Sequence, residues 1–261
     1  MFSDVDASGQ AETARRYLSA AAERAAEMRR EGYSRLGVRN GWSVLDVGCG
    51  LGEVCADLAA LVGQTGRVVG IDASEAMIAH ARERWGGSPI EFAVGDAEAL
   101  HFEDATFDAA RAERVVQHLR HPATAIAEMA RVVRPGGRVF VLDPVHDATI
   151  VATQYPEVWA TIRAYGPGSV RQPRAGLFLK EWMIAAGLDV TVVIGARLIE
   201  DWPASRTLQR VDDSAALAVT AGALTASQLE DFLAEQERRF EEGVFAQSVF
   251  FVQALGTKPS S

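Results

Sequence analysis

Three glycines at alternate positions form the pattern in this chain that most clearly indicates ligand binding. Gly48, Gly50 and Gly52 directly follow the apolar residues 44–47, and Asp72 closes a second apolar stretch. Glycine allows the backbone to turn tightly and to approach a ligand closely. In doubly wound α/β domains, an acidic residue at the end of the second strand accepts hydrogen bonds from ribose hydroxyls. The pattern therefore predicts a pocket for a nucleoside.

The spacing of these glycines also indicates which kind of nucleoside compound binds. A dinucleotide site needs the sequence G-x-G-x-x-G, in which the third glycine frees a helix N-terminus for a pyrophosphate. Here the third glycine comes one residue early and is followed by Glu53, whose charge would repel a pyrophosphate. Asp46, two residues before the first glycine, adds a second negative charge. A cationic ligand without phosphates fits better, and S-adenosylmethionine is such a ligand.

Alternating strands and helices must hold these residues in place. Apolar runs and helical spacing predict strands at 43–47, 67–71, 90–94, 107–111 and 138–142 and helices at 53–62, 75–85 and 123–133. A helix at 10–36 precedes them, and a helix at 177–186 and strands at 190–194 and 246–252 follow. Ser74 is a candidate N-cap, and Thr225 with Gln228 forms a candidate capping box. This rhythm predicts a parallel sheet with helices on both faces.

Composition limits the possible partners. The chain has 261 residues, 48% of them hydrophobic, and a formal net charge of -9. Nucleic-acid binding requires a concentrated positive face, so we expect no nucleic-acid partner. The sequence shows neither a membrane-span pattern nor a signal-peptide pattern, so we expect a cytoplasmic protein without a membrane partner. The two cysteines, Cys49 and Cys55, predict neither a disulfide framework nor a metal site.

Five segments occur in the order of the motifs of a known family. They are VLDVGCGLGEV at 44–54, GIDAS at 70–74, GDAEAL at 95–100, FDAARAERVVQHL at 107–119 and EMARVVRPGGRVFVLD at 128–143. Together they resemble motifs I to V of the class I S-adenosylmethionine-dependent methyltransferases, in particular the small-molecule group that includes ubiquinone and menaquinone biosynthesis enzymes. The resemblance covers roughly residues 40–145. It implies an α/β fold with a doubly wound, seven-stranded, mostly parallel Rossmann-like sheet.

The resemblance also implies how the rest of the chain is organised. Residues 1–40 would form an N-terminal helical lid, and residues 41–145 the cofactor-binding core. Residues 146–176 would be an insertion on the substrate side. Residues 177–261 would complete the core, with a helical insertion near 200–224. The N-terminal helix and the insertions would then cover a small acceptor, and we expect a monomer or a homodimer.

The family's contacts to the methionyl end of the cofactor fall on the glycine loop. The resemblance implies that the backbone of Gly48, Cys49, Gly50 and Gly52 meets this end. Asp46 would lie near the methionyl ammonium group or would brace the loop through a hydrogen bond. Both interpretations of Asp46 stay open on the sequence.

The remaining contacts implied by the resemblance are to the nucleoside. Asp72 would bind the ribose hydroxyls, and Met77 would flank the adenine unless it belongs to the core. Further implied contacts are those of Ala73, Asp96 and Ala97 to adenine and of the Arg111 backbone carbonyl to the methionyl group.

Catalysis by such a site requires little from side chains. Methyl transfer from a sulfonium is an in-line displacement, and much of its acceleration comes from holding the two groups in line in a dry pocket. A general base is needed only when the acceptor must lose a proton. The candidates are His118, after the fourth strand, and His146, after the fifth, although either could simply brace its loop. No residue cluster has the spacing of metal ligands, so we expect no metal.

The acceptor pocket should come from the variable segments. Tyr17, Tyr155 and Trp159 are candidate substrate contacts, unless they only pack the lid helices. An aromatic lining would suit a hydrophobic metabolite, such as a secondary metabolite or a quinone-like compound. The sequence therefore favours S-adenosylmethionine-dependent methylation of oxygen, nitrogen or carbon in a small acceptor.

Three alternatives stay open at this point. A protein with the same cofactor motifs could catalyse cyclisation or rearrangement by using the positive charge of the sulfonium. It could also bind the cofactor without turnover, as a regulatory or scaffold module. A nicotinamide-dependent dehydrogenase is a third possibility, against which the glycine spacing and Glu53 argue.

Overall fold

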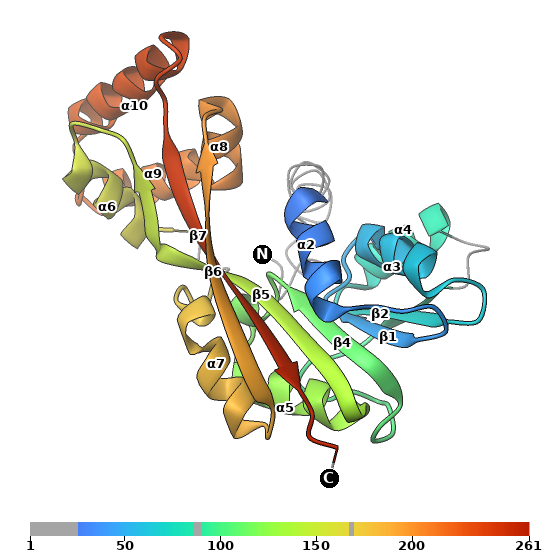
Figure 1. Ribbon diagram of the computed structural model, residues 1–261. Coiled ribbons are helices and arrows are strands. Elements are labelled where there is room, and N and C mark those ends of the chain that lie inside the picture. The colour runs from blue at the N-terminus through green and yellow to red at the C-terminus, as the bar shows by residue number, and fades with distance from the viewer. Residues whose placement is uncertain (1–25, 86–89, 167–169, 261) are drawn as a thin grey trace.

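A seven-stranded sheet forms the centre of the part of the chain that the computed structural model describes, residues 26–85, 90–166 and 170–260 (Figure 1). Its strand order is β3-β2-β1-β4-β5-β7-β6. The first five strands pair in parallel, and β7 pairs antiparallel with β5 and β6. The predicted doubly wound, mostly parallel α/β fold is therefore confirmed. The strands are β1 Ser43–Val47, β2 Arg67–Asp72, β3 Ile90–Val94, β4 Phe107–Glu113, β5 Val133–Val151, β6 Asp189–Ile199 and β7 Gln247–Thr257.

Helices cover both faces of this sheet, as an almost continuously apolar parallel sheet requires. One face carries α2, α3 and α4, and the other carries α5 and α7 (Figure 1). Two separate apolar clusters fill the two interfaces: Leu58 and Ile78 belong to the first, and Met129 and Leu179 to the second. The helices are α2 Ala26–Leu36, α3 Glu53–Val62, α4 Glu75–Trp85, α5 Pro122–Val132 and α7 Ala175–Ala185.

The carboxyl ends of the central strands meet at one edge of the sheet. Val47, the last residue of β1, pairs with Ile71 of β2 on one side and with Ala112 of β4 on the other. The chain proceeds from β1 outward to β3 and then returns to β4 beside β1. In open α/β sheets, ligands bind in the crevice at this reversal of strand order. The topology therefore places a pocket directly after Val47 and Glu113.

Strands β5, β6 and β7 extend beyond the ends of the other four strands and carry a helical cap (Figure 1). Trp159 and Trp202 both pack against Phe232, with ring centroids 6.1 Å and 6.3 Å apart, and these rings form the centre of a third apolar cluster. The cap includes more than the predicted insertions, because α10 turns its buried Phe232 toward α6 and α8 rather than toward the sheet. Its helices are α6 Pro156–Ala164, α8 Trp202–Leu208, α9 Val211–Thr220 and α10 Ala226–Glu241.

Most local predictions match the structure, and the exceptions involve long-range pairing. The bounds of β1, β3, α3 and α4 are those expected, and both predicted caps form: Ser74 Oγ accepts from Met77 N at 3.1 Å, and Thr225 with Gln228 makes a capping box. The prediction that the fifth strand ends at 142 is wrong. Pro144 is tolerated inside β5 because β4 pairs with β5 only as far as Leu142, which leaves that side of the strand open.

Gly70 in β2 tests how tightly the sheet packs below the glycine loop. A Cβ atom there would lie 2.7 Å from Cys55 Sγ and 3.0 Å from Cys49 Sγ. Gly70→Ala should therefore lower the free energy of unfolding by about 1–3 kcal/mol through overpacking, measured by urea denaturation. Gly195→Ala in β6, whose Cβ would have nothing within 4 Å, is the matched control and should not destabilise the protein. Equal stability of the two variants would contradict this packing.

Candidate functional site

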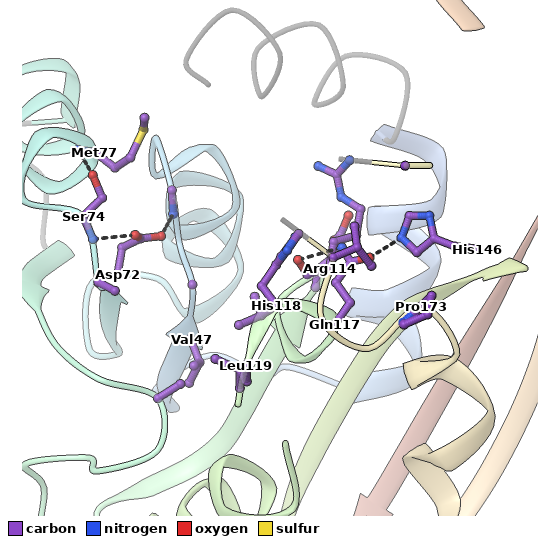
Figure 2. Close-up of a pocket in the computed structure, with 18 of the residues that line it drawn as sticks. Val47, Asp72, Ser74, Met77, Arg114, Gln117, His118, Leu119, His146 and Pro173 are labelled. Carbon is purple, nitrogen blue, oxygen red and sulfur yellow. Dashed lines mark hydrogen bonds between the residues drawn. The ribbon is translucent and has the colours of Figure 1, made fainter. Parts of the chain in front are cut away.

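A cavity of about 400 Å³ lies at the carboxyl edge of the sheet, between the core and the cap. One side is formed by the loops after β1, β2 and β3 and includes Asp72 and Met77. The facing side is formed by the segment after β4, the extension of β5 and part of the cap, and includes Arg114, His118 and His146. Figure 2 shows these two groups of side chains on opposite sides of the pocket. The size is that of a small-ligand site.

The glycine loop lines the cavity through Gly48 and Gly50. Gly48 has φ 70°, and a Cβ atom on it would collide with the side chain of Val115, so glycine is required both for the turn and for the space. Cys49 and Gly52 are buried and lie outside the lining. A Cβ on Gly52 would lie 2.7 Å from the Phe92 ring, so this third glycine allows helix α3 to pack closely. Gly48 and Gly50 therefore line the pocket and Cys49 and Gly52 do not, while the predicted backbone contacts of all four with the methionyl end stay predictions.

Asp72 lines the cavity and also fastens two loops. Its Oδ2 accepts a hydrogen bond from Gly50 N at 2.9 Å, and its Oδ1 accepts one from Ser74 N at 2.9 Å (Figure 2). The carboxylate thus shapes the glycine loop in addition to facing the cavity. Because each carboxylate oxygen has two lone pairs, both oxygens retain capacity to accept from a diol.

The predicted adenine contacts lie together at the same end of the cavity. Ala73, Met77, Asp96 and Ala97 all belong to the lining. Met77 is buried, at 4% exposure, so it serves both the core and the pocket wall. Asp96 is exposed, and its Oδ1 accepts from Glu98 N at 2.8 Å, which fixes the orientation of the carboxylate. This end therefore combines an apolar wall with two acidic groups.

Asp46 and Arg111 lie beneath the cavity instead of in its wall. Arg111 Nη1 lies 3.3 Å from Asp46 Oδ1, and Arg111 Nη2 lies 2.6 Å from Glu113 Oε2. Burial raises the pKa of Asp46 to about 6, and the Arg111 guanidinium acts against this shift. Of the two interpretations of Asp46, the structure shows the bracing one. The guanidinium of Arg111 is held by these two carboxylates outside the lining, and the predicted contact of the Arg111 backbone carbonyl with the methionyl group stays a prediction.

Both ring nitrogens of His146 have hydrogen-bond partners, which fix the position of the ring. Its Nε2 lies 2.5 Å from Gln117 Oε1, and its Nδ1 lies 3.3 Å from Arg163 Nη2 (Figure 2). The amide oxygen requires a proton on Nε2, and the guanidinium donates to Nδ1. Burial lowers the pKa of His146 to about 3, and Arg163 adds to this effect. The ring is therefore neutral with both nitrogens occupied, which corrects its assignment as a general base.

His118 also lines the cavity, in the short 3₁₀ turn Val116–His118 after β4. Its backbone N donates to Val115 O at 2.9 Å, which closes this turn directly after the strand. Of the two predicted histidines, His118 is therefore the one that stays a candidate base.

The predicted aromatic contacts do not form the acceptor side. Trp159 is buried at 5% exposure, and its Nε1 donates to Thr149 O at 3.0 Å within the cap. Neither Trp159 nor Tyr155 lines the cavity, because Trp159 packs inward on Phe232 and Tyr155 precedes helix α6 as its N-cap. Tyr17 lies outside the described residues. Tyr155 and Trp159 therefore do not form the apolar acceptor pocket that the sequence led us to expect from them.

This side combines apolar residues, among them Leu119, Pro173 and Leu208, with polar residues that the sequence analysis did not single out. Arg114, Gln117 and Arg163 all line the cavity. Gln117 is buried, and its Nε2 donates to Arg114 O at 3.1 Å while its Oε1 meets His146. The one available signal in the sequence was the place of Arg114 directly after a strand that ends at the ligand edge.

Comparisons with known proteins agree with this geometry. The model of a family described as "Methyltransferase domain" matches residues 45–141. This segment is a methyltransferase domain of the class I S-adenosylmethionine-dependent family. The chain is 40% identical over 111 residues to a ubiquinone/menaquinone biosynthesis C-methyltransferase of Pseudomonas entomophila, which covers 41% of this chain and 43% of that protein.

Two further similarities concern longer parts of the chain. It is 38% identical over 197 residues to an uncharacterised 37.1 kDa protein in transposon TN4556 of Streptomyces fradiae, covering 73% of this chain and 56% of that protein. The chain spans about half the length of the curated relatives it matches. The crystal structure of a candidate methyltransferase from Bacillus halodurans shares the fold, with a TM-score of 0.63, 20% identity and coverage of 88% and 98% of the two chains.

The residues of this methyltransferase domain fit S-adenosylmethionine, the cofactor of the family. Between Val47 and Ala97, the described lining contains two carboxylates, Asp72 and Asp96, and contains neither lysine nor arginine. A cationic nucleoside suits this end, whereas a pyrophosphate would be repelled. Across the described ranges, no helix is long and apolar enough to cross a membrane.

A buried carboxyl lies near the acceptor side of the methyltransferase pocket, at the point where β5 passes beneath it. Asp143 is fully buried, and its Oδ1 accepts from Gln117 N at 3.3 Å. Its Oδ2 has no hydrogen-bond partner within the described part of the chain. Burial raises the pKa of Asp143 to about 8. The group therefore stays protonated in the folded protein at pH values where an unfolded chain would ionise it.

This shift predicts a specific dependence of stability on pH. An aspartate ionises near pH 4 in the unfolded chain, so the contribution of Asp143 to the stability of the wild type should fall as the pH rises from about 4 to about 8. Asp143→Asn removes this titration, and the variant should gain on the wild type by up to about 1.4 kcal/mol per pH unit across that window. Urea denaturation at pH 4.5, 6 and 8 measures the difference. Parallel pH profiles of the two proteins would contradict the assignment.

Proposed function

We propose that this protein transfers the methyl group of S-adenosylmethionine to a small acceptor bound between the core and the cap. The observation that carries the proposal is the division of one cavity into two ends. The end at Asp72 and Asp96 has the acceptors and apolar wall that a nucleoside needs. The end at Arg114 and His118 lies across the cavity from it, where a second molecule would meet the reactive methyl.

When bound, S-adenosylmethionine supplies an electrophilic methyl group on a sulfonium. Asp72 orients the nucleoside and, through Gly50 N, holds the glycine loop that surrounds the methionyl end. Gln117 fixes the wall opposite, because it bonds to both His146 and the Arg114 carbonyl. His118 lines this end, and we assign to it the removal of a proton when the acceptor is a hydroxyl or an activated carbon. The chain's contribution is chiefly the alignment of two reactants away from water.

The class of acceptor does not follow from the relatives. The Pseudomonas entomophila protein is by name a quinone-biosynthesis enzyme, but its similarity covers 41% of this chain. The cap, which supplies the acceptor side, lies mostly outside that segment, and its aromatic residues face inward. The acceptor is therefore best sought among small metabolites of several kinds. The cytoplasmic location and the monomeric or dimeric state stay predictions of the sequence.

Calorimetric titration with S-adenosylhomocysteine tests the cofactor end. The wild type should bind it, and Asp72→Asn should weaken binding at least about tenfold, because a charge-assisted hydrogen bond to the ribose is lost. Glu83→Gln on the exposed side of α4 is the matched control and should bind normally. Unfolding curves of all three proteins show whether Asp72→Asn keeps its fold, since Asp72 also fastens two loops.

A metabolite screen with methyl-labelled S-adenosylmethionine then tests the reaction. A product heavier than its acceptor by one labelled methyl group is expected. An altered product of unchanged mass would favour the cyclisation alternative instead. A folded wild type that binds neither S-adenosylmethionine nor S-adenosylhomocysteine would contradict the proposed function altogether.

A further inference from the structure

We infer that the acceptor carries an anionic oxygen group, a carboxylate or a phosphate, which binds to Arg114 and Arg163. This inference rests on the proposed function, because it concerns the acceptor end of the same cavity. It is carried by two guanidinium groups that line this end and that form no ion pair with any carboxylate of the described residues, and by the ion pairs that Glu113 and Asp147 make with other arginines.

The guanidinium group of Arg114 has neither a hydrogen-bond nor an ion-pair partner among the described residues. Arg114 lines the cavity, and its Nε is fully buried. Its backbone has φ 56°, a left-handed conformation that is costly for an arginine. Two bonds impose this conformation: Arg114 N donates to Leu142 O at 2.7 Å, and Arg114 O accepts from Gln117 Nε2. The structure thus holds an unpaired cation at the cavity wall.

Arg163 enters the cavity from helix α6 of the cap. Its side-chain hydrogen bonds within the described chain go to neutral acceptors, with Nη1 3.0 Å from Gln209 Oε1 and Nη2 3.3 Å from both the carbonyl oxygen and the Nδ1 of His146. Its Nε is buried without a partner, and its guanidinium lies 5.7 Å from the centre of the Trp159 ring. Burial lowers the pKa of Arg163, and the charge of Asp147, which also lines the cavity, acts against this shift. A half-buried charge in this state favours a bound anion.

The carboxylates of this region are already occupied. Asp147 lies 2.5 Å from Arg174 Nε, and Glu113 lies 2.6 Å from the buried Arg111. His146 is neutral, so it neither adds to the positive charge nor cancels it. A third lining arginine, Arg210, is paired with Asp213 at 2.7 Å. Glu113 and Asp147 also line the cavity, but their ion pairs with Arg111 and Arg174 leave Arg114 and Arg163 without an ion-paired carboxylate among the described residues. The cofactor end, in contrast, carries the carboxylates of Asp72 and Asp96 and no arginine among its described lining residues.

This separation of charge fits an anionic acceptor better than a neutral one. A guanidinium offers parallel N–H donors that match the two oxygens of a carboxylate or phosphate. A neutral acceptor would leave two desolvated cations unpaired next to the sulfonium, which is itself positive. An anion bound there would be held across the cavity from the nucleoside, where its attached nucleophile could face the methyl group.

Thermal unfolding of the protein saturated with S-adenosylhomocysteine tests this inference. The probes are benzoate, its neutral isostere benzamide, and inorganic phosphate, each titrated at constant ionic strength. Benzoate or phosphate should raise the unfolding temperature of the wild type, and benzamide should not. A stronger response to benzoate would identify a carboxylate site, and a stronger response to phosphate a phosphoryl site.

Variants decide whether the two arginines are responsible. Arg114→Gln and Arg163→Met should each raise the anion concentration needed for half-maximal stabilisation about tenfold or more. Arg163→Met keeps the contact with Trp159, so a loss of packing does not imitate the effect. Arg238→Gln, an exposed cap arginine paired with Glu242, is the matched control and should respond like the wild type.

Two results would overturn the inference: a wild type that no anion stabilises more than benzamide does, or an anion response that persists undiminished in both variants. Stabilisation by S-adenosylhomocysteine alone is recorded for every protein. If S-adenosylhomocysteine alone does not stabilise the wild type, the proposed function is contradicted. If it does and the anions do not, only the anion site is contradicted.

Discussion

The buried guanidinium of Arg111 is the group on which the pocket depends. A full charge with 1% exposure must be compensated within the protein, and Asp46 and Glu113 provide the two carboxylates. The ion pair between Asp46 and Arg111 joins β1 to β4 below the cavity, and Glu113 pairs with Arg111 within β4. The ring of Tyr33 on α2 lies 5.5 Å from the same guanidinium. Removing one partner of such a buried pair typically costs about 3–5 kcal/mol. The floor of the site is therefore fixed in position.

Both ends of the cavity continue from this floor along the chain. The glycine loop begins two residues after Asp46, and Arg114 follows directly after Glu113. Asp72 then bonds to Gly50 N, and Gln117 bonds to the Arg114 carbonyl and to His146. Each end thus starts at a carboxylate that Arg111 holds and is completed by one further polar side chain. The result is a cavity with Asp72 and Asp96 at the nucleoside end and, at the cap end, two arginines that form no ion pair within the described residues.

The sequence was sufficient for those features that local physics decides. The bounds of α3 and α4 follow from helical spacing and from the Ser74 cap, and the nucleoside end follows from glycines placed after an apolar strand. The bounds of β5 could not be obtained in this way. Pro144 is a strand breaker locally, and only the antiparallel partner β7 makes the longer strand favourable.

The roles of single polar residues were predicted less well, because their partners are distant in sequence. Asp46 is 65 residues from Arg111, and His146 is 29 residues from Gln117, so neither hydrogen bond leaves a local pattern. Whether an arginine lacks a carboxylate partner likewise depends on residues that are distant in sequence. Arg114 and Arg163 are ordinary arginines in the sequence, and only the folded structure shows that no carboxylate reaches them within the described residues.

A crystal structure of the protein with bound S-adenosylhomocysteine tests the division of the cavity most directly. The account predicts that the ribose lies against Asp72 and the adenine between Met77 and Asp96, with the sulfur directed toward the side of Arg114 and Gln117. The volume next to Arg114 and Arg163 should stay free for an acceptor. A nucleoside bound against these two arginines, with Asp72 facing solvent, would contradict the account.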